Sequence, residues 1–124
     1  MPTQCGGKED KFGVSEVDID EDPIKPGTTV QVTVTATPKV DITDGAELKF
    51  DIKLGSFSIH TEKRDICKDL GVDCPIPAGQ ETDFGVGIAI TKAAPSVNVT
   101  AVVTGTNGDG SKISCLKIPL EVHK

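Results

Sequence analysis

Residues 46–54 read Ala-Glu-Leu-Lys-Phe-Asp-Ile-Lys-Leu, an unbroken alternation of apolar and charged side chains. Successive side chains of a β-strand point to opposite faces, so the apolar residues of this stretch share one face and the charged residues share the other. A strand of this kind must bury its apolar face against a second layer. The stretch therefore predicts a β-sheet with one buried and one solvent-exposed face.

The same two-residue period recurs along most of the chain. Further strands are predicted around 14–20, 30–37, 57–60, 82–90, 97–103 and 116–122. Gly, Pro and Asp separate them, and Thr-Asn-Gly-Asp-Gly at 106–110 is typical of a hairpin turn, in which Asn-Gly and Asp-Gly tolerate positive φ. Residues 61–79 are predicted to form a long loop with at most one turn of helix. Seven short strands predict an all-β, two-sheet sandwich in which 1–124 form a single domain.

Composition excludes several classes of partner. The 124 residues carry a formal net charge of −6 and no stripe of Lys and Arg, which argues against nucleic acid because phosphate binding needs a basic surface. No stretch approaches the roughly 20 apolar residues of a helix that spans a bilayer. Aromatic residues make up only 3% of the chain, so the core is predicted to consist of aliphatic, β-branched side chains.

The four cysteines predict two disulfide bonds, because an even number in a short chain is typical of an oxidising compartment. Zinc fits poorly, since the spacer between Cys67 and Cys74 is long for a knuckle and neither histidine stands at ligand spacing. Four cysteines allow three pairings, and the sequence alone does not choose among them. We favour Cys5–Cys115, which would tie the two ends together, and Cys67–Cys74, which would close a short loop.

No group of polar residues forms a catalytic motif. His60 stands before Thr-Glu-Lys-Arg-Asp at 61–65, but strand alternation predicts that it faces solvent and that Ile59 faces inward. No serine or cysteine has a recognisable base and orienting acid. The chain is therefore predicted not to be an enzyme and to need no cofactor.

Two polar motifs lie on other predicted strands. Asp18, Asp20 and Asp22 alternate, but the segment lacks the Gly and Glu of a calcium loop, which predicts an exposed acidic strand face and no metal site. Asn98 begins an Asn-Val-Thr glycosylation sequon and is predicted to point outward, since Val97 and Val99 point inward.

The segments around the cysteines resemble those of the ML lipid-recognition family. They read Cys-Gly-Gly-Lys at 5–8, Ile-Cys at 66–67, Asp-Cys-Pro-Ile-Pro-Ala-Gly at 73–79 and Ser-Cys-Leu-Lys-Ile-Pro-Leu at 114–120. A true immunoglobulin domain would need Cys, Trp and Cys in the sandwich centre, and this chain has no Trp. The resemblance spans essentially the whole chain. The third disulfide of many animal members is absent at 20–26, so the pattern is closer to plant, protist or fungal members.

The resemblance implies an immunoglobulin-like sandwich whose sheets part to enclose a hydrophobic cavity for one lipid, without catalysis, and it implies the same two disulfides. By analogy with the family, the mouth should lie between two neighbouring strands near the long loop. The candidate lipid-binding residues are the inward-facing apolar side chains Phe50, Ile52, Leu54, Phe57, Ile59, Phe84, Val86, Ile88, Val99, Ala101, Val103, Leu116, Ile118 and Leu120. Ile66, Ile76 and Pro77 flank the short disulfide and are candidates for a rim or for a tip that touches the membrane.

The sequence and the resemblance together predict a monomeric lipid-binding or lipid-transfer protein. It would hold one sterol, phospholipid or fatty acid and contact membranes transiently. The alternative is a secreted protein-recognition module, in which lipid is absent or serves as the signal. Secretion or an endolysosomal or vacuolar lumen is expected, with a signal peptide removed and Met1 added for expression, because Met-Pro-Thr is no signal peptide.

Overall fold

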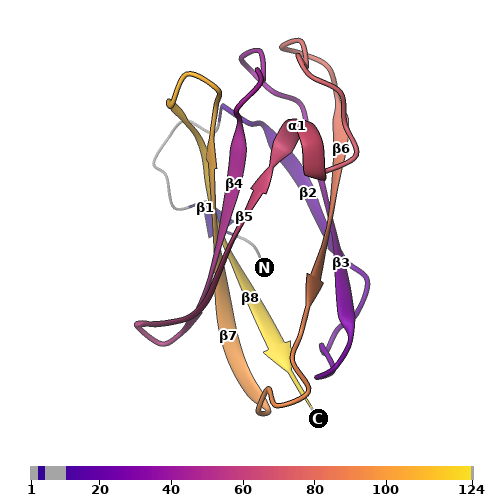
Figure 1. Cartoon of the computed structure of the whole chain (residues 1–124), viewed down its shortest axis with the longest axis vertical. Helices are drawn as coiled ribbons and strands as arrows, with labels where there is room; N and C mark the ends of the chain where they lie inside the picture. Colours follow the sequence, from indigo (N-terminus) through magenta and orange to yellow (C-terminus); the bar gives the residue numbers. More distant parts are fainter. Residues whose placement is uncertain (1–2, 5–10, 124) are drawn as a thin grey trace.

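The structure is a computed structural model and describes residues 3–4 and 11–123. Nearly all of its regular structure is β, arranged in two facing layers (Figure 1). The elements of the described residues are, in order, β1 (Thr3–Gln4), β2 (Val14–Ile19), β3 (Thr29–Ala36), β4 (Glu47–Leu54), β5 (Phe57–Asp65), α1 (Ile66–Asp69), β6 (Thr82–Ala89), β7 (Val97–Thr106) and β8 (Lys112–Val122). No helix in this part of the chain is long and apolar enough to cross a bilayer.

Two antiparallel sheets form the predicted sandwich. The larger has the strand order β1-β8-β7-β4-β5, and the smaller has the order β2-β3-β6. The alternation read from the sequence matches the burial on the central strands: Val30, Val32 and Val34 of β3 are buried, as are Leu48 and Phe50 of β4. The predicted all-β, two-sheet sandwich is thus confirmed. Its cross-sheet packing comes from aliphatic side chains that alternate with polar ones, as in other sandwiches.

One prediction about the strands is wrong. Residues 61–65 do not begin a loop but continue β5, which pairs with β4 until Asp65 lies opposite Glu47. Only then does the chain turn into α1, where the Asp65 side chain accepts hydrogen bonds from the backbone N–H groups of Cys67 and Lys68 and so caps the helix. The polar sequence at 61–65 concealed the strand, because an edge strand has only one neighbour and tolerates polar side chains.

A β-bulge near the start of β5 overturns the expected direction of His60. The pairing of β5 with β4 shifts between Ile52 and Lys53, so that Ile52 lies opposite His60 while Lys53 lies opposite Ser58. The extra residue, Ile59, shifts the alternation by one. Residues directly opposite each other share a face, so His60 is on the inner face with Ile52. The expectation that His60 faces solvent is therefore corrected.

The buried phenylalanine side chains lie away from the cavity, toward one end of the sandwich. We call this the disulfide end, because it carries α1 and the Cys67–Cys74 bond, which confirms one predicted pairing. The rings of Phe12 and Phe84 contact each other here with centroids 4.9 Å apart. The predicted partner of Cys115 is Cys5, which lies outside the described residues, so that pairing stays a prediction.

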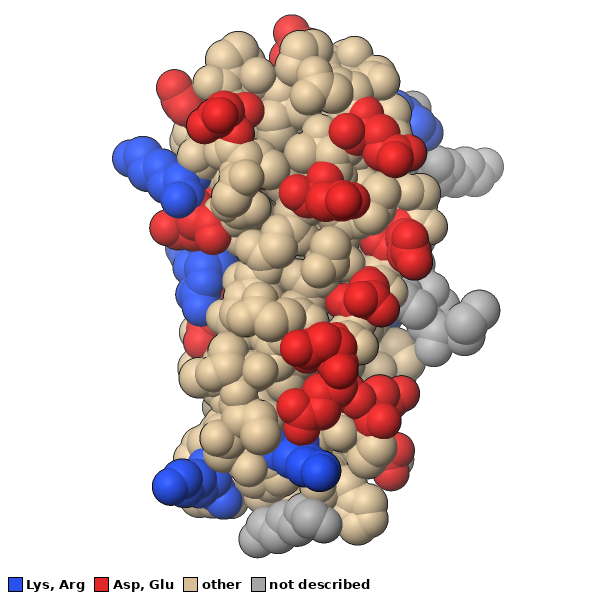
Figure 2. All heavy atoms as spheres, turned by 90° about the vertical axis from the view of Figure 1, so that its right-hand side faces the viewer, with Lys and Arg blue, Asp and Glu red and all other residues tan. Residues whose placement is uncertain are grey.

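The outer face of the smaller sheet is acidic. Figure 2 shows Asp and Glu side chains gathered on the side of the molecule formed by β2, β3 and β6. Asp18, Asp20 and Asp22 are exposed, and Asp20 accepts a hydrogen bond from the backbone N–H of Gln31 at 3.0 Å. The exposure agrees with the predicted acidic strand face. Asn98 is also exposed, as expected for a sequon, while its glycosylation stays a prediction.

Candidate functional site

A cavity of about 470 Å³ lies between the two sheets, at the end opposite α1. We call this the cavity end; it includes the β4–β5 turn at 55–56 and the loop at 91–96. All side chains that line the cavity are apolar except His60 and Thr91. The lining consists of Ile19, Ile24, Val30, Val32, Ile52, Leu54, Ile59, His60, Ile88, Ala89, Ile90, Thr91, Ala93, Ala94, Pro95, Val97, Val99, Leu120 and Val122.

The position of the aromatic rings explains why this end is hollow. The chain has four phenylalanines, of which Phe12, Phe50 and Phe84 are buried and none lines the cavity. The fourth, Phe57, is 76% exposed. Two sheets packed about 10 Å apart need bulky side chains to fill the space between them. Apart from His60 and Thr91, the cavity end offers only Val, Ile, Leu, Ala and Pro, and these side chains leave the space open.

The structure divides the candidate lipid-binding residues into three groups. Those that line the cavity are Ile52, Leu54, Ile59, Ile88, Val99 and Leu120. Those buried in the core without lining it are Phe50, Phe84, Val86, Ala101, Val103, Leu116 and Ile118. Phe57 alone is neither, since its ring is exposed beside the β4–β5 turn, and its expected inward position is corrected. Phe57 lies opposite Leu54 next to the β4–β5 turn, so its exposure comes from its position at the end of the sandwich and not from the bulge.

Several cavity residues were not among the candidates. Val30 and Val32 could have been found, because their inward direction follows from the alternation on β3. Ile24 and the loop 91–95 could not, since no periodic pattern marks an irregular segment as part of a cavity wall.

The predicted rim at the short disulfide is wrong. Ile66 is 0% exposed and Ile76 is 2% exposed, and both belong to the core at the disulfide end. The backbone of Ile76 pairs with that of Ile42 through two hydrogen bonds of 2.9 Å, which pulls the segment inward. Pro77 is exposed but lies at the same end. None of the three lines the cavity. Ile66 and Ile76, which lie close to the loop cysteines, are buried in the core instead.

The two lateral seams between the sheets differ near the cavity. On one side, Ile24 is hydrogen-bonded to β8 through Glu121 and His123, at 2.8 and 2.9 Å. On the other side, β5 faces β6, and two hydrogen bonds cross this seam: Gly85 N–H donates to Leu70 C=O, and Arg64 donates to Gly87 C=O. Nearer the cavity end, Ile59, His60 and Ile88 line open space. Ile59 and His60 are also exposed, so we call this part of the seam between β5 and β6 the mouth.

A polar network follows the inner face of β5 at this mouth. His60 Nε2 lies 2.8 Å from Glu62 Oε1, and Arg64 Nη2 lies 2.7 Å from Glu62 Oε2. Glu62 Oε2 is buried without a hydrogen bond of good geometry, so the adjacent guanidinium is its charge partner. Arg64 Nη2 also donates to the carbonyl of Gly87 at 3.4 Å and thereby joins the two sheets. The network places three polar side chains on the cavity side of an otherwise apolar sandwich.

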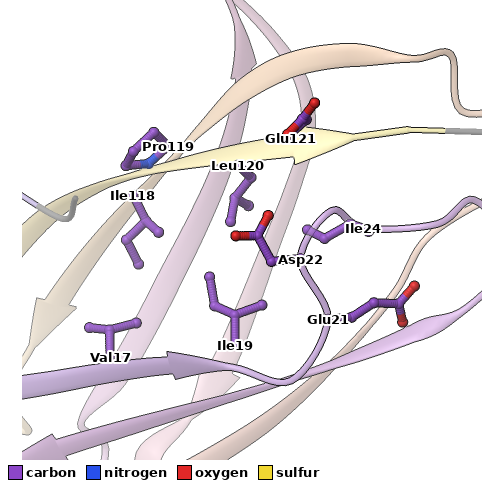
Figure 3. A pocket seen from close by; sticks show the side chains of 9 residues that line it. All are labelled: Val17, Ile19, Glu21, Asp22, Ile24, Ile118, Pro119, Leu120 and Glu121. Atoms are coloured by element: carbon purple, nitrogen blue, oxygen red, sulfur yellow. The ribbon is translucent and has the colours of Figure 1, made fainter.

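A second hollow of about 240 Å³ lies between β2 and β8 (Figure 3). Its apolar side chains include Val17, Ile19 and Ile118, and Asp22 and Glu121 also line it. It shares Ile19, Ile24 and Leu120 with the main cavity, so these residues form the wall between the two spaces. The carboxylates make this hollow less suited to an apolar ligand than the main cavity.

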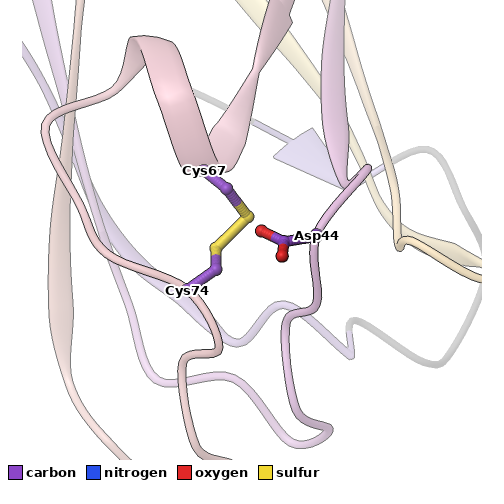
Figure 4. A group of neighbouring side chains, drawn as sticks. All are labelled: Asp44, Cys67 and Cys74. Atoms are coloured by element: carbon purple, nitrogen blue, oxygen red, sulfur yellow. A yellow bond between two sulfur atoms is a disulfide. The ribbon is translucent and has the colours of Figure 1, made fainter.

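One cluster at the disulfide end has the composition of a metal site. Asp44, Cys67 and Cys74 bring potential ligand atoms within 4.8 Å of one another (Figure 4). The two sulfur atoms are bonded to each other, however. Metal ions bind thiolates, which a disulfide does not supply. This cluster therefore lacks the ligands of a metal site while the bond is intact.

An antiparallel sandwich that keeps an aliphatic cavity open at one end defines a class of protein able to hold a small apolar ligand between its sheets. Comparison with known families makes the assignment specific. The chain belongs to the ML domain family, which matches residues 2–122.

Individual relatives agree in sequence and in fold. The chain is 26% identical over 124 residues to the phosphatidylglycerol/phosphatidylinositol transfer protein of Mycosarcoma maydis, covering 96% of this chain and 64% of that protein. It is 29% identical over 111 residues to the protein of the same name from Aspergillus oryzae, covering 87% of this chain and 63% of that protein. The chain thus spans somewhat less than two thirds of the length of these relatives.

Two solved structures share the fold. A Niemann-Pick type C2 protein from Japanese carpenter ant superposes with a TM-score of 0.80 at 25% identity, covering 99% of both chains. Chicken MD-1, solved in complex with lipid IVa, superposes with a TM-score of 0.67 at 16% identity, covering 97% of this chain and 86% of that one. The second likeness is one of fold alone. Both support the immunoglobulin-like sandwich.

Proposed function

We propose that this protein binds one lipid in the cavity between its sheets and transfers it between membranes, without catalysis. The observation that carries the proposal is the 470 Å³ cavity with its aliphatic lining. Each methylene group moved from water into such a site contributes about 0.8 kcal/mol, so affinity needs no polar chemistry. Relatives named phosphatidylglycerol/phosphatidylinositol transfer proteins add support from the family.

The volume of the cavity limits how much of a bound lipid can be buried. The space open to a ligand between the sheets is about 470 Å³. A sterol or a single acyl chain matches this size better than two full acyl chains do. We infer that a sterol or fatty acid would enter almost completely, whereas a phospholipid would leave part of itself outside the mouth.

The proposal extends to location and assembly. The Cys67–Cys74 disulfide is typical of an oxidising compartment, which supports secretion or an endolysosomal or vacuolar lumen. The cavity lies within one sandwich, so a monomer suffices for binding. The alternative, a protein-recognition module without transfer, gains no support from the site, because a filled core would suit that function better than a hollow one.

We expect delipidated protein incubated with vesicles of labelled lipid to take up saturable lipid at about one molecule per chain. Mass spectrometry of lipid extracted from the purified protein would identify the natural ligand class. An absence of saturable uptake for sterols, phospholipids and fatty acids alike would contradict the proposal.

The surface that meets the membrane is proposed to be the β4–β5 turn. Leu54, Phe57 and Ile59 are 39%, 76% and 54% exposed, the exposed large apolar side chains of the described residues. Leu54 and Ile59 also line the cavity, so the apolar surface is continuous from the tip into the mouth. A tip of this kind would seat the mouth at the bilayer surface, where lipid can pass without crossing water.

We expect Phe57→Ser to slow lipid transfer between vesicles about tenfold while equilibrium lipid binding and thermal stability stay unchanged. Removing the exposed ring deletes about 1.5 kcal/mol of apolar burial in the membrane but no contact inside the protein. The matched control is Pro77→Ser, an exposed apolar residue at the disulfide end. Slower transfer by the control and not by Phe57→Ser would place the membrane contact at the disulfide end instead.

A further inference from the structure

His60 is the only titratable side chain among those that line the cavity in the described chain. The β-bulge places it opposite Ile52 on the inner face of β5, and its side chain is 50% exposed at the mouth. A lipid lying in the aliphatic cavity would therefore bring its polar end close to His60. The lining offers Thr91 as the other polar side chain, but its hydroxyl oxygen already accepts a hydrogen bond from the backbone N–H of Ala93 at 3.3 Å.

The neighbours of His60 determine which ring atom is available to a ligand. An ionised carboxylate can only accept hydrogen bonds, so at 2.8 Å from Glu62 the Nε2 atom of a neutral His60 must carry the proton. The tautomer with Nε2–H leaves Nδ1 as an acceptor. Within the described residues, the side chain of His60 has Glu62 as its hydrogen-bond partner. Nδ1 is thus the ring atom left for a ligand.

Arg64 holds this arrangement in place. Its guanidinium pairs with Glu62 at 2.7 Å and reaches the carbonyl of Gly87 on the opposite sheet. Because Arg64 holds one oxygen of the Glu62 carboxylate, the other oxygen is fixed in its direction toward the His60 ring. Glu62 and Arg64 are therefore positioning residues for His60. The charges of Glu62 and Arg64 offset each other, and the cavity lining contains no Lys or Arg that would attract a phosphate.

From this geometry we propose that His60 is a specificity-determining residue, which accepts a hydrogen bond through Nδ1 from a hydroxyl group on the polar end of the bound lipid. The inference rests on the proposed function. The hydroxyl can come from a sterol or from the glycerol or sugar-like part of a lipid headgroup, and both present the same donor. The cavity thus selects a lipid that ends in a hydroxyl over one of equal apolar size that lacks it.

The test compares matched lipid pairs on delipidated protein. One pair is a fluorescent sterol and its 3-methyl ether, and the other is a monoacylglycerol and the methyl ester of the same fatty acid. We expect the wild type to prefer the hydroxyl member of at least one pair about fivefold, the effect of one net hydrogen bond. Which pair shows the preference identifies the source of the hydroxyl. His60→Leu should bring that ratio close to one, because the lipid with a hydroxyl loses its acceptor while both lipids meet the same apolar wall.

Two controls separate specificity from general damage. Leu54→Ala removes apolar lining and should weaken both members of a pair equally, leaving their ratio intact. Nitrogen NMR of the His60 ring should report the Nε2–H tautomer. A wild-type ratio near one for both pairs, or a ratio that survives His60→Leu, would overturn this inference while the proposed function stands. If the wild type bound an anionic lysophospholipid more tightly and His60→Leu lost this preference, the inference would be overturned in favour of a phosphate contact. No binding of any probe would overturn both proposals.

Discussion

Val99→Phe is expected to lower the affinity for lipid about thirtyfold and to leave the fold intact. Val99 is buried on β7 and lines the cavity, so a larger side chain at this position grows into open space. The added ring atoms displace about three methylene groups of the bound lipid, which corresponds to about 2 kcal/mol. Titration of the delipidated variant with a fluorescent lipid measures the loss, and thermal denaturation checks the fold.

The same strand provides a matched control. Val103 is also buried on β7 and also faces inward, but it lies opposite Phe50 in the filled part of the sandwich. Val103→Phe should overpack the core and lower the free energy of unfolding by about 1–3 kcal/mol. Equal destabilisation by both substitutions would mean that the space beside Val99 is filled in solution, and it would contradict the cavity.

Asn107→Ala is expected to lower the free energy of unfolding by about 2 kcal/mol. The Asn107 side chain is 8% exposed and joins the β7–β8 turn to the segment before β4. Its Oδ1 accepts from the backbone N–H groups of Thr43 and Gly108 at 3.0 and 2.9 Å, and its Nδ2 donates to the carbonyl of Asp41 at 2.8 Å. Alanine would leave these backbone groups without partners, which is costly in a buried site. Chemical denaturation gives the change directly.

The control for this loss is Asn98→Ala in unglycosylated protein. Asn98 lies on β7 and is exposed, so its removal should change stability by less than about 0.5 kcal/mol. If Asn107→Ala and Asn98→Ala lowered the free energy of unfolding equally, the hydrogen bonds of Asn107 would contribute nothing to the stability of the disulfide end. Gly108 adds a steric reason for the close packing there, because a Cβ at that position would lie 2.2 Å from the carbonyl oxygen of Asp44.

The same turn shows how far residue preferences predict local geometry. Asn-Gly and Asp-Gly at 106–110 correctly predicted the hairpin between β7 and β8. The positive φ falls on Gly110, at 87°, and no residue other than glycine has a positive φ in the described chain. Asn107 is there for its side chain, which reaches a segment more than sixty residues away in the sequence. A turn motif carries no information about such a distant partner.

The candidate site was predicted well where strands are regular. Ile52, Ile88, Val99 and Leu120 line the cavity because alternation places them inward. Phe50, Phe84 and Val103 also face inward, but they are buried in the filled part of the sandwich. Alternation alone could not separate these core residues from the cavity residues. Inward direction is a local property, whereas the distinction between core and cavity depends on what stands opposite on the other sheet.

The alternating stretch at 46–54, and others like it, determined that this chain forms two sheets with aliphatic inner faces. The cysteine segments added the ML family and one disulfide that the structure contains. Only the tertiary structure decided which end stays hollow, because that depends on where the three buried phenylalanines lie in the sandwich. It also decided that His60 faces the cavity, since one extra residue in β5 reverses the alternation and becomes apparent only when the pairing with β4 is known.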